Sequence, residues 1–208
     1  MEQVFLIIEL IGTVAFSISG AMIAIEKKMD IFGVAILGVM TALGGGITRD
    51  LILGNTPPQM FRNPIYAAVA VAVALIFFIP AVRRILNKRP RTNEITLLIM
   101  DSLGLGIFTV IGIKTAILSG HQENGFLLVF VGVITGVGGG ILRDIMAGKT
   151  PFVFVKHFYA SASLIGAIIC AVLWRHTGEI IAMSAGFVVI FILRLLAAKF
   201  RWSLPKAK

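Results

Sequence analysis

The sequence predicts an all-α integral membrane protein with seven transmembrane helices, built from two inverted three-helix repeats and a seventh helix. Three observations predict this fold. Of the 208 residues, 58% are hydrophobic and 14% are charged, whereas about a quarter of the residues in a soluble domain are charged. The hydrophobic residues form seven long segments, and a glycine-rich motif occurs twice. This composition argues against a soluble domain or a disordered chain, and the single cysteine excludes an intrachain disulfide.

The seven hydrophobic segments are close to the length that crosses a bilayer, which is about 20 predominantly apolar residues. Asp101 and Arg194 are the only charges inside the fourth and seventh segments. The first ten residues carry Glu2 and Glu9 and no positive charge, so we expect them to begin the first helix and not to form a cleaved signal peptide. The predicted spans are Leu10–Ile25, Ile31–Thr48, Pro64–Val82, Ile95–Ile113, Gly125–Leu142, Phe158–Trp174 and Ile180–Ala198.

Basic residues in the connecting segments predict the orientation, because cytoplasmic loops are enriched in lysine and arginine. With seven spans, thirteen basic residues fall on the side of the C-terminus, and only Arg62 and Arg175 fall on the opposite side. We therefore expect an external N-terminus and a cytoplasmic C-terminus. The net charge of +9 then indicates contact with anionic membrane lipids and not with nucleic acid. The thirteen are Lys27, Lys28, Arg83, Arg84, Lys88, Arg89, Arg91, Lys149, Lys156, Lys199, Arg201, Lys206 and Lys208.

The chain contains an internal repeat. Residues 44–57 and 138–151 are identical at nine of fourteen positions, and the preceding helices align with Glu9 opposite Asp101. The predicted organisation is a first repeat (1–82), a basic linker (83–94), a second repeat (95–175) and a seventh helix with a basic tail (176–208). Because each repeat has an odd number of spans, the second enters the membrane from the opposite face, which is typical of transport proteins.

Glycine triplets occupy equivalent positions in the second and fifth spans, at Gly44, Gly45 and Gly46 and at Gly138, Gly139 and Gly140. Glycine inside a helix costs about 1 kcal/mol relative to alanine. We expect both helices to be broken or kinked there, around a polar pathway; the alternative is close helix packing through small residues. The same packing explains Gly12, Gly20, Gly104 and Gly112, whose helix faces we expect to be free for contacts between subunits.

Ionisable residues inside spans are costly in lipid, so they are usually paired or functional. The repeat predicts a Glu9–Arg49 contact at the outer mouth of a pathway and an Asp101–Arg143 contact at the inner mouth. Each arginine is followed by an aspartate, Asp50 or Asp144. The alternative is that the arginines reach lipid headgroups while the aspartates cap helix ends.

The remaining polar residues of the spans suggest no catalytic chemistry. Lys114, near the outer end of the fourth span, either extends to the headgroups or projects into the pathway and repels cations. Ser17, Ser19, Thr41 and Thr135 offer oxygens to a pore, or hydrogen bonds between helices. No nucleophile–base pair, metal-ligand spacing or cofactor motif is found, which argues against an enzyme.

Two copies of GGGIxRD, each followed by GxTP, resemble the prokaryotic trimeric intracellular cation (TRIC) channels, also labelled glycine-transporter-like or UPF0126 membrane proteins. The resemblance implies a homotrimer in a bacterial or archaeal plasma membrane, with one pore per protomer between the second and fifth helices. It implies potassium as the main permeant ion, sodium as less favoured, and no cofactor. It also implies kinks at both glycine triplets and a mouth or gate at the two Arg-Asp pairs. The lysine-rich gating motif of the animal members is not evident.

Two functions from different classes remain open at this point. One is a passive monovalent cation channel. The other is a secondary transporter of a small neutral solute such as glycine, which the inverted repeat permits equally. A structural membrane protein would explain the spans but not the paired glycine triplets.

Overall fold

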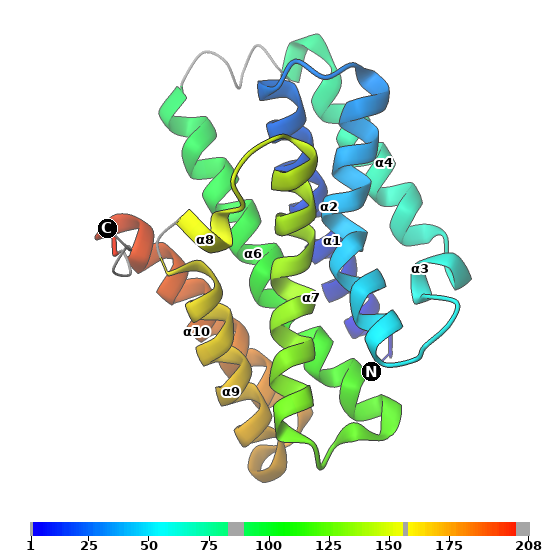
Figure 1. Ribbon diagram of the computed structural model, residues 1–208, viewed down its shortest axis with the longest axis vertical. Helices are drawn as coiled ribbons and strands as arrows, with labels where there is room; N and C mark the ends of the chain where they lie inside the picture. The colour runs from blue at the N-terminus through cyan, green and yellow to red at the C-terminus, as the bar shows by residue number, and fades with distance from the viewer. Residues whose placement is uncertain (1, 83–89, 156–157, 203–208) are drawn as a thin grey trace.

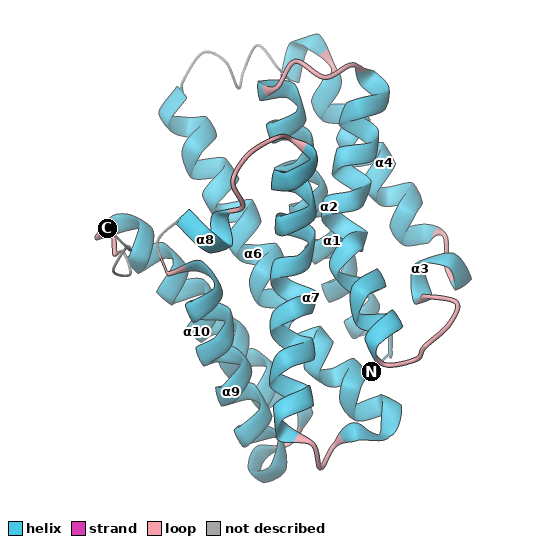
Figure 2. Ribbon diagram, viewed as in Figure 1, coloured by secondary structure: helices cyan, strands magenta, loops and turns pink. Residues whose placement is uncertain are grey.

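The computed structural model describes residues 2–82, 90–155 and 158–202, and these ranges contain only helices and loops (Figures 1 and 2). Long helices follow the predicted spans, and short helices follow the two glycine-rich motifs. The elements are α1 (Glu2–Glu26), α2 (Ile31–Ile52), α3 (Gln59–Arg62), α4 (Ile65–Phe78), α6 (Pro90–Ala116), the π-helical turn η1 (Ile117–His121), α7 (Gly125–Met146), α8 (Phe152–Val155), α9 (Tyr159–Thr177) and α10 (Glu179–Lys199).

Six of the described helices are long and apolar enough to cross a membrane: α1, α2, the helix that continues from α6 through η1, α7, α9 and α10. The predicted third span contains the shorter apolar helix α4, and residues 80–82 are helical again after a break at Ile79, so the described residues do not confirm seven full-length spans. The 14 residues of α4 extend about 21 Å, against a hydrocarbon core of roughly 30 Å. The helix stops because Ile79 is extended ahead of Pro80, whose ring disfavours a helical conformation in the preceding residue.

The helices form two groups that meet along α2 and α7. Helices α1, α2 and α4 pack together, α6, α7 and α9 form the second group, and α10 packs on α6 and α9. In Figure 1, α1 begins at the end of the molecule where α2 ends, and α6 begins at the opposite end. The two groups therefore run in opposite directions, as the predicted inverted repeat requires. We call the end where α1 begins the N-face and the opposite end, where α6 begins, the far face.

The glycine triplets do not break the helices, so this part of the predicted fold is wrong. Helices α2 and α7 are continuous through both triplets. A Cβ atom on Gly45 would lie 2.1 Å from the carbonyl oxygen of Thr135, and one on Gly139 would lie 2.0 Å from that of Thr41. The triplets allow the backbones of α2 and α7 to touch, which is the close packing that the sequence left as the alternative.

The centre of the protein is apolar and contains repeat-related residues from α1 and α6. The ring centres of Phe16 and Phe108 lie 5.3 Å apart. A Cβ atom on Gly104 would collide with the Phe16 ring, and one on Gly12 would press on the Phe108 ring. Gly20 and Gly112 pack in the same way against α2 and α7. These four glycines are used within the chain, so the expectation that they are free for subunit contacts is wrong.

Candidate functional site

Each repeat places an arginine and the aspartate that follows it in a buried ion pair near the end of a long helix. Arg49 Nε lies 2.8 Å from Asp50 Oδ1 at the end of α2, and Arg143 Nε lies 2.9 Å from Asp144 Oδ1 at the end of α7. All four residues are buried. The arginines therefore do not extend to lipid headgroups, which was the alternative that the sequence left open.

The aspartates also fix the chain that follows each long helix. Asp50 Oδ2 accepts a hydrogen bond from the backbone N–H of Gln59, the first residue of α3. Asp144 Oδ2 accepts one from Phe152, the first residue of α8. Each aspartate thus binds an arginine with one oxygen and the start of a short helix with the other. The GxTP segment between them is the loop that this bond closes.

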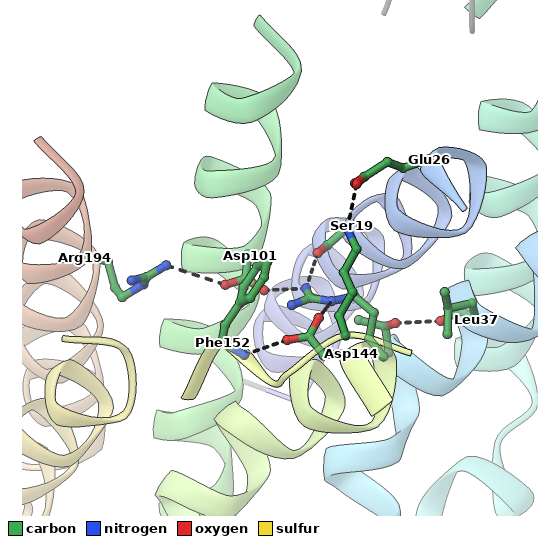
Figure 3. Close-up of polar contacts among 10 residues, drawn as sticks. Ser19, Glu26, Leu37, Asp101, Asp144, Phe152 and Arg194 are labelled. Carbon is green, nitrogen blue, oxygen red and sulfur yellow. Dashed lines mark hydrogen bonds and ion pairs between the residues drawn. The ribbon is translucent and has the colours of Figure 1, made fainter. Parts of the chain in front are cut away.

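The predicted Asp101–Arg143 contact is present near the far face. Arg143 Nη1 lies 2.6 Å from Asp101 Oδ1 and also donates to the hydroxyl of Ser19 on α1. The guanidinium of Arg143 stands over the Phe152 ring at 4.8 Å from its centre. Arg143 therefore ties α1, α6 and α7 together, and Figure 3 shows Ser19, Asp101 and Asp144 converging at this point.

Two further residues join this far-face cluster that the sequence reasoning did not assign to it. Arg194 of α10 is 3% exposed, and its Nη2 lies 3.8 Å from Asp101 Oδ2, toward which it points in Figure 3. Its guanidinium carbon lies 4.5 Å from the centre of the Tyr159 ring. The available signal was that Arg194 is the only charge inside the seventh apolar segment, because such a charge needs a partner.

The predicted Glu9–Arg49 ion pair at the N-face is wrong. Glu9 instead accepts a hydrogen bond from the hydroxyl of Tyr66 on α4, and among the described residues no ion pair joins it to Arg49. Arg49 directs its Nε toward Asp50. The phenol of Tyr66 takes the place that the sequence assigned to the arginine, and nothing in the sequence aligned this tyrosine with an acid.

Glu9 and Arg49 nevertheless line the same cavity at the N-face. The cavity holds about 50 Å³ for water-sized molecules and lies between α1, α2, α3, α4 and α6. One glycine of the α2 triplet, Gly46, also faces it. The cavity ends beside Phe108, which is part of the apolar centre. Its other lining residues are Thr13, Ala42, Leu43, Ile47, Asp50, Gln59, Met60, Tyr66 and Ile111.

All four hydroxyls proposed as pore oxygens hydrogen-bond to other groups of the protein. Thr41 donates to the carbonyl of Leu37 and Thr135 donates to that of Val131, both at 2.6 Å, and Ser17 donates to the carbonyl of Ala70 at 2.6 Å. These three hydroxyls are buried. The Ser17 bond joins α1 to α4, and the two threonine bonds lie within their own helices. The fourth hydroxyl, on Ser19, accepts the Arg143 hydrogen bond described above.

Lys114 follows neither of the two readings left open for it. Its Nζ lies 2.7 Å from Glu179 Oε1 at the start of α10, and the ammonium stands over the ring of Phe5. The lysine therefore connects α6 to α10 near the N-face. It is absent from the residues that line the cavity.

Taken together, the fold and the charge clusters define a class: a multi-pass α-helical membrane protein with buried charges at both ends of an inverted repeat. A family model described as "Glycine transporter" matches residues 6–81 and 98–175. The UPF0126 inner membrane protein YadS of Escherichia coli K12 is 36% identical over 203 residues, which cover 95% of this chain and 93% of the relative. A UPF0126 membrane protein of Deinococcus radiodurans is 36% identical over 200 residues, 95% and 89% of the two chains.

Solved structures with the same fold come from work on TRIC channels. One, from a study of the structural basis for conductance through TRIC cation channels, is 38% identical, covers 97% of this chain and 96% of that chain, and has a TM-score of 0.85. The TRIC orthologue of Rhodobacter sphaeroides is 32% identical, with 95% and 98% coverage and a TM-score of 0.86. This chain belongs to the TRIC/UPF0126 family of membrane proteins, and it is not an enzyme.

Proposed function

We propose that this protein is a passive monovalent cation channel, permeable to potassium and less so to sodium, with a pore in each protomer beside α2 and α7. The observation that carries the proposal is the N-face cavity. Its lining contains two carboxylates, those of Glu9 and Asp50, and one guanidinium, that of Arg49. Rings of acidic side chains at a pore mouth favour cations. The solved relatives are described as cation channels, which supports the same activity here.

We propose that the pathway runs from the N-face cavity past the apolar centre at Phe16 and Phe108 to the far-face cluster, and that this conformation is its closed state. There Arg143 is fully buried and bonded to Asp101 and Ser19. We propose that opening requires this arginine to leave the path, and that the glycine triplets let α2 and α7 slide where their backbones touch.

We also propose a homotrimer in a bacterial or archaeal plasma membrane, with the N-terminus outside, the basic tail inside, and anionic lipids at the cytoplasmic surface. The repeats are proposed with the boundaries 1–82 and 95–175, separated by the linker 83–94 and followed by 176–208. Support comes from the relative described as a trimeric intracellular cation channel and the one described as an inner membrane protein. Large exposed hydrophobic side chains on the outer helix faces, such as Ile168 and Ile192, suit lipid or subunit contacts.

A neutral-solute carrier is the second candidate, because the matching family model is described as "Glycine transporter". Purified protein in potassium-loaded vesicles distinguishes the two. A channel releases potassium down its gradient whether or not glycine is present, and external glycine does not accumulate. A carrier takes up labelled glycine with saturation and releases no potassium on its own, and that result would replace the channel proposal.

A further inference from the structure

The charged residues of the two clusters are related by the repeat, with one exception. Glu9, Arg49 and Asp50 at the N-face correspond to Asp101, Arg143 and Asp144 near the far face. The tyrosine that begins the last helix of each repeat also corresponds: Tyr66 bonds to Glu9, and Tyr159 packs beside the far-face cluster. The exception is Arg194, which comes from α10, the helix that the repeat does not contain.

Arg194 changes the charge of one end only. The N-face cluster contains two carboxylates and one guanidinium, whereas the far-face cluster contains two carboxylates and two guanidiniums. The other ion pairs among the described residues, Lys114–Glu179, Arg175–Glu123 and Lys149–Glu26, are each neutral. The two buried clusters therefore differ by one positive charge, and that difference lies in a protein interior where charges are poorly screened.

We propose that Arg194 makes the two ends of the pathway electrostatically unequal, so that cations pass more readily from the N-face to the far face than in reverse. This inference rests on the proposed channel function. A net negative mouth raises the local cation concentration, and a neutral mouth does not. In symmetric potassium chloride the current carried by cations entering at the N-face is then the larger one.

The burial of Arg194 supports a direct electrostatic role. Its side chain is 4% exposed, and it reaches the same carboxylate that holds Arg143, so its charge acts on the group that closes the path. Asp101 Oδ1 faces Arg143, and Asp101 Oδ2 faces Arg194. A cation approaching from the far face meets an acid whose charge is already balanced.

The test is single-channel recording in membrane patches from cells, where all copies of the protein have one orientation. Wild type should rectify in symmetric potassium chloride. Arg194→Gln should remove the rectification by raising the current that enters from the far face. Glu9→Gln should also remove it, by lowering the current that enters from the N-face. Arg194→Lys keeps the charge and should keep the rectification.

Salt and a matched control separate electrostatics from a packing defect. Lys199→Gln makes the same charge change on the exposed side of α10 and should leave wild-type rectification. Raising salt from about 0.1 M to about 1 M shortens the screening length from about 10 Å to about 3 Å and should weaken the wild-type asymmetry. Unchanged rectification in both Arg194→Gln and Glu9→Gln would overturn the inference while the channel function stands. Absence of any cation current in wild type would overturn the channel function itself.

Discussion

Gly45 of α2 and Gly139 of α7 occupy reciprocal positions at the crossing of their helices. A Cβ atom on Gly45 would lie 2.1 Å from the carbonyl oxygen of Thr135, and one on Gly139 would lie 2.0 Å from that of Thr41. Each glycine thus faces a backbone carbonyl of the other repeat. Thr135 lies four residues before Gly139, and Thr41 lies four residues before Gly45. This contact sets the separation of the two helices that we place beside the pore.

The crossing predicts a sharp difference between adjacent glycines. Gly45→Ala must push α7 away from α2, because its new methyl group meets backbone that cannot move aside, and such overpacking costs about 1–3 kcal/mol or more. Gly46→Ala meets only Arg49 Nη2, at 3.9 Å, and should be tolerated. Thermal unfolding in mild detergent measures both. Equal stability of the two variants would show that α2 and α7 do not touch as described.

Loss of the Asp101 carboxylate should destabilise the fold. Asp101→Asn leaves Arg143 and Arg194 buried without their shared counter-charge, and removing one partner of a buried pair typically costs about 3–5 kcal/mol. The exposed pair Arg175–Glu123 provides the control, since Glu123→Gln should cost less than about 1 kcal/mol. Chemical denaturation followed by tryptophan fluorescence gives both values. A cost for Asp101→Asn as small as that of the control would contradict the burial of this cluster.

Ser19 should hold the closed state by fixing the position of Arg143. Its hydroxyl accepts a hydrogen bond from Arg143 Nη1, so Ser19→Ala loosens the arginine that closes the far-face end. We expect a higher open probability with unchanged unitary conductance. Ser17→Ala lies two residues away and removes a hydroxyl that bonds only the carbonyl of Ala70 among the described residues, so its gating should match wild type. Recordings in which both variants gate alike would argue that Arg143 does not close the path.

The Lys114–Glu179 pair should act on the packing of α6 against α10 and not on permeation. Lys114→Gln and Glu179→Gln should each lower stability by a similar amount, up to about 1 kcal/mol, with little added loss in the double variant. Both single variants should keep the wild-type conductance. If Lys114 instead projected into the pathway, Lys114→Gln would raise the cation current and Glu179→Gln would have a different effect.

Sequence reasoning recovered the helices and their duplication because both depend on local patterns. Apolar length identifies the spans, and the GGGIxRD motif at residues 44–50 and 138–144 marks the repeat without any knowledge of packing. The Asp101–Arg143 pair followed from the repeat and from the cost of unpaired charge in a membrane. Helix α4 was expected to be longer, although Pro80 in the sequence already marked its end.

The remaining errors concern choices that only three-dimensional packing decides. A run of three glycines fits a broken helix and a close crossing equally well, and the facing Thr41 and Thr135 carbonyls select the crossing. The partner of Glu9 depended on which side chain of α4 pointed inward, and a tyrosine takes that position. Arg194 belonged to a helix outside the repeat, so the symmetry argument that found the other charges could not place it.

The most direct test of the channel account is planar bilayer recording of the purified protein with a potassium chloride gradient. The account predicts discrete unitary currents whose reversal potential lies near the potassium equilibrium potential. When sodium replaces potassium on the dilute side, the reversal potential should move further from zero, because sodium is the less permeant ion. Currents that reverse at the chloride potential would contradict it. So would the absence of unitary currents from a preparation that takes up glycine with saturation.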